Sequence, residues 1–283
     1  MERKPNSPPS LQDVLTLQPS DNEHLLARNL SGGRGGLIRG GQILAQTLVA
    51  AGRARPGYVV RTAQVCFVRS AHEDQLLEYT TRELFMGRSV IVIEVRVLQG
   101  NSVICTSVVS LDAHEEDTFR YPMEFTRPGK ISTGRGTEVL RQIEGSSVAA
   151  SGNEYSRSDT SSRHPVAEAW FRWPLAPQEP DEVGDALIAY YTDPVLIPAL
   201  LATQDGVSLG WAHDRLQTTV LTHTLTFHTH TSASDWLFIE ATAHSMRSGR
   251  GYGSGRVTTE QGELVASFVQ DSMVRSNRSG GGP

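Results

Sequence analysis

The feature that most constrains this chain is a weak internal repeat. A helix pattern followed by strand patterns runs from residue 40 to residue 111, and the same order returns from residue 193 to residue 270. Phe67 and Phe227 occupy matching places in the two runs, and the breaks between strands also match. Self-similarity at a long period indicates repeated structural units. The sequence therefore predicts two α+β units, each with a sheet that wraps a buried helix, joined side by side.

The first unit has a clear helix and four clear strands. Gly40-Gly41-Gln42 opens a run whose apolar residues lie on most sides of a helix, which predicts a buried helix. Runs of alternating and β-branched residues follow, separated by short breaks, and they predict antiparallel strands. These strand runs are residues 59–68, 75–87, 89–98 and 103–111.

The second unit contains a helix-start signal and a threonine-rich strand. Asp193-Pro194 combines an N-cap residue with a proline, which predicts that a helix begins there. Residues 216–228 read LQTTVLTHTLTFH and alternate between hydroxyl and apolar side chains, as in a half-buried strand. Strict alternation places Val220 and Thr222 on one face of this strand and His223 on the other.

A polar segment rich in Ser, Gly, Arg and Glu separates the two units. We interpret it as a linker that carries at most a short strand. The predicted domains are an N-terminal unit at residues 11–115, the linker at residues 116–165 and a C-terminal unit at residues 166–276.

Composition argues against several classes of protein. The formal net charge of −5 gives no electrostatic reason to bind nucleic acid. No apolar run approaches the roughly 18 residues of a membrane span, and the N-terminal residues lack the apolar core of a secretory signal. Cys66 and Cys105 lie in apolar runs, which predicts buried thiols in a reducing compartment. We therefore expect a cytoplasmic protein.

A metal site finds little support in the sequence. His228 and His230 are close together, but no cysteine or carboxylate at ligand spacing joins them. We expect neither a metal ion nor a cofactor.

Several motifs, taken in order, relate the chain to a known family. They are the GGQ helix start, YYTDPVLIPALL, THTLTFH, DWLF, GRGYGSGRV and LVASFVQDSMVR. Together they resemble the acyl-CoA thioesterase II family over nearly the whole chain, from about Leu11 to Arg275. The resemblance implies a double hotdog fold, in which two helix-wrapped antiparallel sheet units are fused. It also implies hydrolysis of acyl-CoA to free fatty acid and CoA.

The same resemblance implies a set of catalytic residues. In that family an Asp, a Ser or Thr, and a Gln jointly hold the attacking water, and they fall on Asp193, a middle position, and Gln270. The middle position holds Val220 in this chain, which is a departure from the family pattern. Because alternation puts Thr222 on the same face as Val220, we predict Thr222 as the replacement hydroxyl. If the strand has a bulge, Thr219 is the second candidate for this hydroxyl.

Thioester chemistry suits such a set of residues. Asp193 would accept a proton from water, while Gln270 and a threonine hydroxyl would orient that water. The oxyanion needs backbone donors, and the helix start at Gly41 and Gln42, our predicted substrate-binding residues, offers them, as does the one at Asp193. Candidates for an acyl tunnel, which fit a packed core equally well, are Leu44, Leu48, Leu196 and Leu200.

Two other functions stay open on the sequence. Val220 in the hydroxyl position also fits a non-catalytic protein that binds acyl-CoA or acts as a regulator. A hotdog hydratase or dehydratase would need an Asp–His pair across the site, and His223 is expected to face away from it. Sheets of this kind leave edges to cover, so we expect a homo-oligomer, either a dimer or a tetramer.

Overall fold

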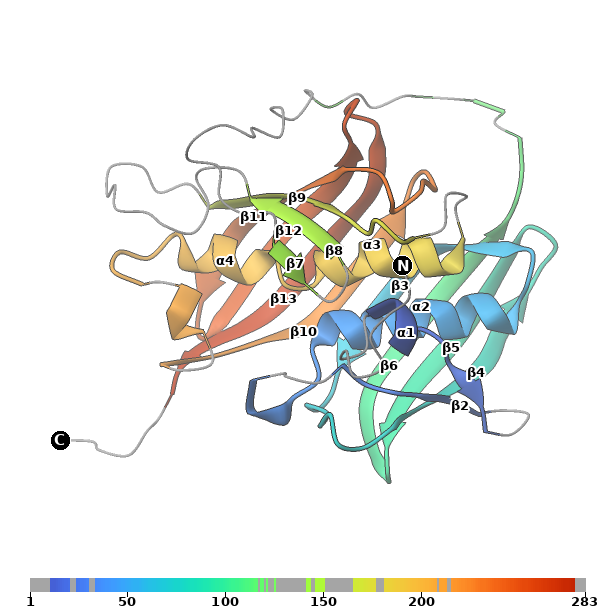
Figure 1. Cartoon of the computed structure of the whole chain (residues 1–283), viewed down its shortest axis with the longest axis horizontal. Helices are drawn as coiled ribbons and strands as arrows, with labels where there is room; N and C mark the ends of the chain where they lie inside the picture. Colours follow the sequence, from blue (N-terminus) through green and yellow to red (C-terminus); the bar gives the residue numbers. More distant parts are fainter. Residues whose placement is uncertain are drawn as a thin grey trace.

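The computed structural model shows one large antiparallel sheet with helices packed on it (Figure 1). It describes residues 11–20, 24–30, 34–116, 118–119, 121, 125, 141–143, 146–150, 165–176, 181–207, 209–212 and 215–277. Within these residues, the helices are α1 (Leu11–Val14), α2 (Gly40–Ala54), α3 (Glu182–Thr192) and α4 (Leu196–Leu201), with 3-10 turns η1 (Arg34–Gly36) and η2 (Leu209–Trp211). The strands of the first half are β1 (Gln18–Pro19), β2 (His24–Ala27), β3 (Tyr58–Phe67), β4 (Leu77–Met86), β5 (Val90–Gln99) and β6 (Ser102–Ala113). Those of the second half are β7 (Arg141–Ile143), β8 (Ser146–Ala150), β9 (Val166–Arg172), β10 (Leu216–Phe227), β11 (Leu237–Arg247), β12 (Arg250–Thr259) and β13 (Leu264–Ser276).

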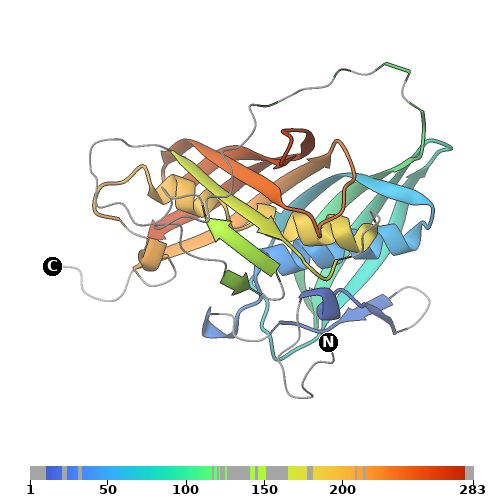
Figure 2. The same cartoon turned by 45° about the horizontal axis from the view of Figure 1, so that its top comes forward.

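The sheet consists of two halves that meet at its centre. Outward from the centre, the first half has the order β3-β6-β5-β4 and the second half has the equivalent order β10-β13-β12-β11. The halves join where β3 pairs with β10, and the hydroxyls of Thr62 and Thr226 lie 3.2 Å apart across this seam. Figure 2 shows α2 against the first half and α4 against the second, with α3 beside α2. The predicted double hotdog, two α+β units joined side by side, is confirmed.

The two halves share an irregularity in strand register. The pairing of β3 with β6 shifts between Val60 and Thr62, and the pairing of β10 with β13 shifts between Val220 and Thr222. One extra residue in each central strand therefore forms a bulge at the same place in both halves. The repeat seen weakly in the sequence thus extends to the details of strand pairing.

The bulge puts Val220 on the same face of β10 as His223, contrary to the prediction. Leu221 is the extra residue, so Val220 and His223 both point to the buried face, while Thr222 is exposed. The prediction that Thr222 shares a face with Val220 is wrong, because it assumed unbroken alternation. Thr219, the second candidate, is also exposed.

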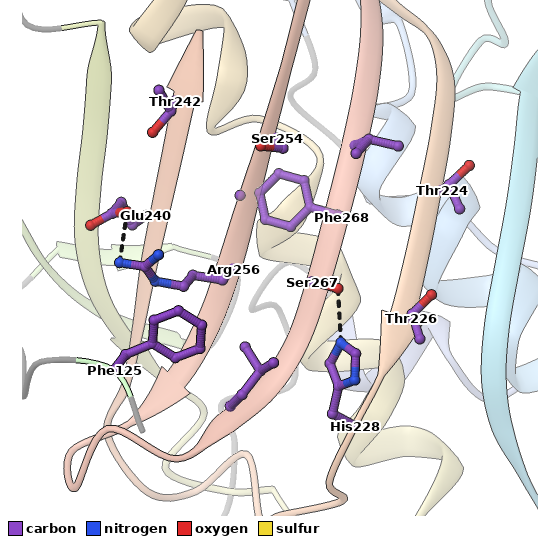
Figure 3. Close-up of a pocket in the computed structure, with 13 residues that line it drawn as sticks. Phe125, Thr224, Thr226, His228, Glu240, Thr242, Ser254, Arg256, Ser267 and Phe268 are labelled. Atoms are coloured by element: carbon purple, nitrogen blue, oxygen red, sulfur yellow. Dashed lines mark hydrogen bonds and ion pairs between the residues drawn. The ribbon is translucent and has the colours of Figure 1, made fainter. Parts of the chain in front are cut away.

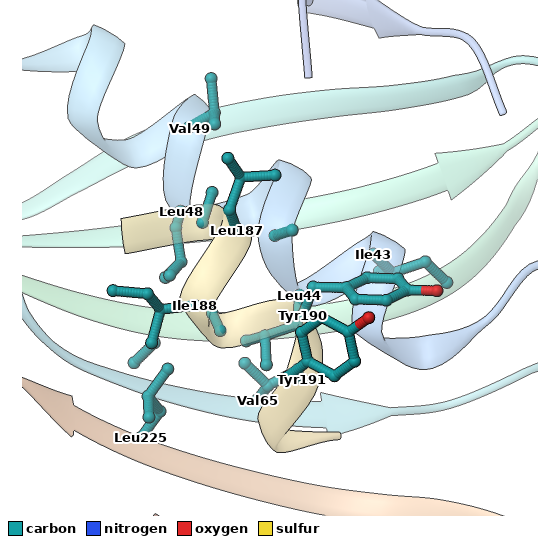
Figure 4. Packing of buried hydrophobic residues seen from close by; sticks show 14 of the residues in the cluster. Ile43, Leu44, Leu48, Val49, Val65, Leu187, Ile188, Tyr190, Tyr191 and Leu225 are labelled. Atoms are coloured by element: carbon teal, nitrogen blue, oxygen red, sulfur yellow. The ribbon is translucent and has the colours of Figure 1, made fainter. Parts of the chain in front are cut away.

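The main core lies between the helices and the inner face of the sheet. Helix α2 begins at Gly40, as its GGQ motif predicted, and is buried along most of its length. It packs against α3, and the core cluster around the two helices includes Leu44, Leu48, Leu187 and Ile188 (Figure 4).

The helix predicted to begin at Asp193 begins later in the chain. Helix α3, which the sequence reading did not identify, ends at Thr192, and Asp193 follows it in helical geometry. A turn separates this residue from α4, which begins at Leu196 with Val195 before it. Asp193 therefore lies at the end of one helix rather than at the start of the next. Its side chain points toward Gly40 and Gly41 at the start of α2.

The predicted linker and the predicted domain boundaries are only partly visible. Much of residues 116–165 lies outside the described residues, and the described part includes β7 and β8, with β8 paired to β9. The boundaries at 115 and 165 stay predictions. Cys105 is buried as expected, but Cys66 is exposed, because it lies on the outer face of β3 opposite Thr222. In the described chain, every helix is too short or too polar to cross a membrane.

The helix–sheet core leads to a stability prediction. Leu48 is 0% exposed on α2, and Leu48→Ala is expected to lower the free energy of unfolding by about 2–5 kcal/mol through lost burial and a cavity. Leu84 on β4 is 46% exposed, so the matched change Leu84→Ala is expected to cost roughly 0.5 kcal/mol or less. Denaturant unfolding measures both. Equal losses would contradict the assigned core.

Candidate functional site

Asp193 lies where the end of α3 meets the start of α2. The backbone N–H of Gly41 donates a hydrogen bond to its carboxylate. A Cβ atom on Gly40 would lie 2.8 Å from Oδ1 of Asp193, and one on Gly41 would lie 2.6 Å from the carbonyl oxygen of Tyr190. Glycine at both positions therefore allows the helix start to approach the carboxylate. The positive end of the α2 dipole faces the negative charge.

The carboxyl group of Asp193 has a pKa near neutral pH. The residue is 8% exposed, and burial raises its pKa from 3.8 to about 7. The hydrogen bond from Gly41 and the positive charge of Arg39 oppose this shift without cancelling it. Oδ1 is buried and accepts no hydrogen bond within the described chain. The group is therefore suited to accept a proton near pH 7.

Gln270 connects the sheet to the end of α3. Its amide nitrogen donates to the carbonyl oxygens of Thr192 at 3.0 Å and Asp193 at 2.9 Å, and it lies 2.6 Å from Nδ1 of His223. The two carbonyl oxygens are acceptors only, so the NH₂ end of the amide must face them. Oε1 then points the other way, and it is buried without a hydrogen-bond partner in the described residues. The side chain presents a fixed, free acceptor.

His223 holds Gln270 in this orientation. Its Nε2 lies 3.0 Å from the hydroxyl of Thr192, and that hydroxyl donates to the carbonyl oxygen of Ala189 at 2.7 Å. The hydroxyl must then accept from Nε2–H, so Nδ1 accepts one N–H of the Gln270 amide, and the other N–H is shared between the carbonyl oxygens of Thr192 and Asp193. Full burial lowers the pKa of His223 to about 3, so the ring is neutral.

The position of His223 both confirms and corrects the sequence reading. It is a core histidine with a partner for each ring nitrogen, as expected. The expectation that it faces away from the site is wrong, because the bulge in β10 turns it to the same face as Gln270. A ring that is neutral and bonded on both sides acts as a support rather than as a base.

The hydroxyl predicted for the site does not lie there. Thr222 is exposed on the outer face of β10, so the structure brings Asp193 and Gln270 together without it. Thr192 directly precedes Asp193, but its hydroxyl is engaged by His223 and Ala189.

Sequence reasoning missed a second hydroxyl on the buried face. Ser272 lies two residues after Gln270 on β13 and directly opposite Val220 on β10. It is 0% exposed, and its hydroxyl lacks a hydrogen-bond partner in the described chain. Strand alternation counted from Gln270 was a signal that could have found it.

The two predicted substrate-binding residues are both engaged by protein groups. Gly41 directs its N–H at Asp193. The side chain of Gln42 accepts from the N–H of Leu30 at 3.0 Å and donates to Oδ1 of Asn29 at 2.9 Å. Gln42 thus secures the segment that leads into α2, and a contact of either residue with substrate stays a prediction.

The leucines proposed for an acyl tunnel belong to the main core. Leu196 and Leu200 of α4 lie over Gly253 and Gly251 of β12, where an added Cβ atom would lie 2.4 Å from a leucine methyl group in each case. The glycines allow α4 to approach the sheet, and the leucines fill the space between them.

A hollow of about 460 Å³ lies on the outer face of the second half (Figure 3). Arg256 pairs with Glu240 at 3.0 Å, and His228 contacts Ser267 at 2.8 Å, within its wall. Neighbouring residues of a strand point to opposite faces, so this hollow is separated from Gln270 by the sheet itself. His230, considered with His228 for a metal site, instead pairs with Asp185 at 2.8 Å.

Comparison with known proteins confirms the family suggested by the motifs. The model of the acyl-CoA thioesterase N-terminal domain matches residues 32–111, and that of the acyl-CoA thioesterase C-terminal domain matches residues 115–274. Acyl-CoA thioesterase 2 of Haemophilus influenzae is 19% identical over 254 residues, which cover 84% of this chain and 87% of that protein.

Solved structures show the same fold. A tesB protein of Mycobacterium avium subsp. paratuberculosis has a TM-score of 0.76 at 20% identity, covering 93% of this chain and 98% of that chain. Acyl-CoA thioesterase II TesB2 of Mycobacterium marinum has a TM-score of 0.75 at 22% identity, covering 96% and 99%. A hot dog fold protein of Alicyclobacillus acidocaldarius has a TM-score of 0.71 at 15% identity, covering 94% and 98%.

The raised pKa of Asp193 has a consequence for stability. The folded protein holds the carboxyl proton more tightly than the unfolded chain does, so stability falls as pH rises from about 4 to about 7. Asp193→Asn keeps an acceptor for Gly41 and removes the buried charge. It is expected to raise the free energy of unfolding at pH 8 by up to about 4 kcal/mol, with no such gain at pH 4. Denaturant unfolding at the two pH values tests this; an equal gain at both would contradict a titration effect.

Proposed function

The chain belongs to the acyl-CoA thioesterase family, and we propose that it hydrolyses acyl-CoA with a water molecule held between Asp193 and Gln270. The observation that carries this proposal is a pair of buried acceptors, Oδ1 of Asp193 and Oε1 of Gln270, that have no partner in the described chain. Unpaired buried acceptors are costly to a fold, and two of them on residues joined by a hydrogen bond favour a functional ligand with two donors. A water molecule is such a ligand.

The two acceptors fix the direction of the attack. Water donates one hydrogen to Asp193 and the other to Gln270, which turns a lone pair toward the thioester carbonyl carbon. As the carbon–oxygen bond forms, the proton passes to Asp193. The tetrahedral intermediate then collapses, the carbon–sulfur bond breaks, and Asp193 returns the proton to the departing CoA sulfur. The products are the free acid and CoA.

The start of α2 supports the charge that this reaction develops. Its dipole points at the reacting region through Gly40 and Gly41, and such fixed dipoles stabilise an oxyanion without reorganising. The homo-oligomer and the cytoplasmic location expected from the sequence stay predictions.

Turnover is expected to depend on Asp193 in its charged form. Asp193→Asn should lower kcat for CoA release by on the order of 100-fold or more, because Asn accepts no proton. In the wild type, kcat/KM should rise with pH through about 7 and level off above it, since protonated Asp193 cannot act as a base. A thiol-reactive dye measures CoA release from acyl-CoA substrates of several chain lengths. A wild type that binds these substrates and releases no CoA would instead support the non-catalytic binding function.

The exposed position of Thr222 gives a separate prediction. Thr222→Val removes the hydroxyl and keeps the shape, and kcat is expected to stay within about twofold of wild type, because this side chain lies on the outer face. The same CoA-release measurement tests it. A loss comparable to that of Asp193→Asn would restore the role assigned to Thr222 from the sequence.

A further inference from the structure

We propose that the hydroxyl of Ser272 is the third protein group that holds the attacking water, a role that rests on the proposed function. Ser272 and Gln270 are two residues apart on β13, so both side chains point to the buried face. Their Cα atoms lie roughly 7 Å apart along the strand, a span over which two side chains can contact one water molecule. Val220 and Gly251 flank Ser272 on the neighbouring strands.

Three buried polar atoms of this region lack partners in the described chain. They are Oδ1 of Asp193, Oε1 of Gln270 and Oγ of Ser272. The first two accept hydrogen bonds, whereas the hydroxyl of Ser272 also donates one. A water molecule that donates to both acceptors and accepts from Ser272 keeps one lone pair free. That lone pair is the one that attacks, and the serine bond sets its direction.

The first half of the molecule shows what the fold itself requires at this position. Val220 lies opposite Ser272 just before the bulge of β10. At the equivalent place in the first half, Val60 lies opposite Leu111, just before the bulge of β3. Leu111 is fully buried in the core, so the fold accepts an apolar side chain there. A buried serine without a partner is therefore a departure that packing does not explain.

The departure at Ser272 occurs together with two others. After the bulge, the second half pairs His223 with Gln270, whereas the first half pairs Ala63 with Val109. The second half thus carries His, Gln and Ser where the first half carries Ala, Val and Leu. These three polar residues lie on the same face of the second half, and two of them, His223 and Gln270, are hydrogen-bonded to each other.

Other hydroxyls fit this role less well. The hydroxyl of Thr192 is engaged by His223 and Ala189, and Thr222 is exposed on the outer face. The hydroxyl of Thr258 is buried without a partner in the described residues, but it lies toward the far end of β12, opposite Leu264. Thr258 therefore serves as a matched control.

The first test removes the hydroxyl of Ser272. Ser272→Ala is expected to lower kcat for CoA release by 10-fold to 100-fold with little change in KM, and to leave Tm unchanged or higher, because an unpaired buried hydroxyl is lost. Thr258→Val removes an equally buried, unpaired hydroxyl and is expected to leave kcat unchanged.

The second test returns the hydroxyl from the opposite strand. Val220 and Ser272 are direct cross-strand neighbours, so Val220→Thr in the Ser272→Ala background is expected to recover most of the lost kcat. Wild-type kcat in Ser272→Ala would overturn the role of Ser272 while leaving the proposed function intact. A loss of kcat that comes with a lower Tm and is not rescued would also overturn it. A wild type without CoA release would overturn both proposals.

Discussion

The contact between Gln270 and the end of α3 is the interaction on which the geometry of the site depends. The last carbonyl groups of a helix have no partner within the helix, and burial makes an unpaired carbonyl costly. One amide from β13 meets the carbonyl oxygens of Thr192 and Asp193, and His223 fixes the amide from the other side. Asp193 is thereby placed relative to the sheet by its own backbone. The side-chain amide of Gln270 carries the free oxygen Oε1 and also binds the backbone of Asp193. The position of Oε1 is therefore fixed relative to the residue that bears the carboxylate.

Much of this arrangement was predictable from strong periodic patterns. The buried helix after Gly40 and the long strands of both halves follow from apolar spacing, which the tertiary structure does not override. The duplicated order of elements predicted two joined units, and the sheet confirms it. Asp193 and Gln270, identified by resemblance to a family, lie together in the structure.

The errors about the face of Thr222 and the helix start at Asp193 have a common cause. Each prediction used a rule for regular secondary structure at a place where the structure is irregular. Alternation predicts faces only while every residue is paired, and the extra Leu221 exchanges the faces of all residues that follow it. The Asp-Pro signal for a helix start failed because α3 already occupies the chain up to Thr192. A bulge and a helix end depend on contacts between distant segments. Neither was visible in a short window of sequence.

The contact between the start of α2 and Asp193 joins the two halves of the chain in one centre. Two identical subunits related by a twofold axis would form two such centres, and every substitution would appear in both. Fusion into one chain removes that symmetry, so each half can change without the other. Here the positions equivalent to His223 and Gln270 have become Ala63 and Val109. The polar groups of the proposed centre are thus confined to one junction, while the equivalent positions of the first half hold apolar side chains buried in the core.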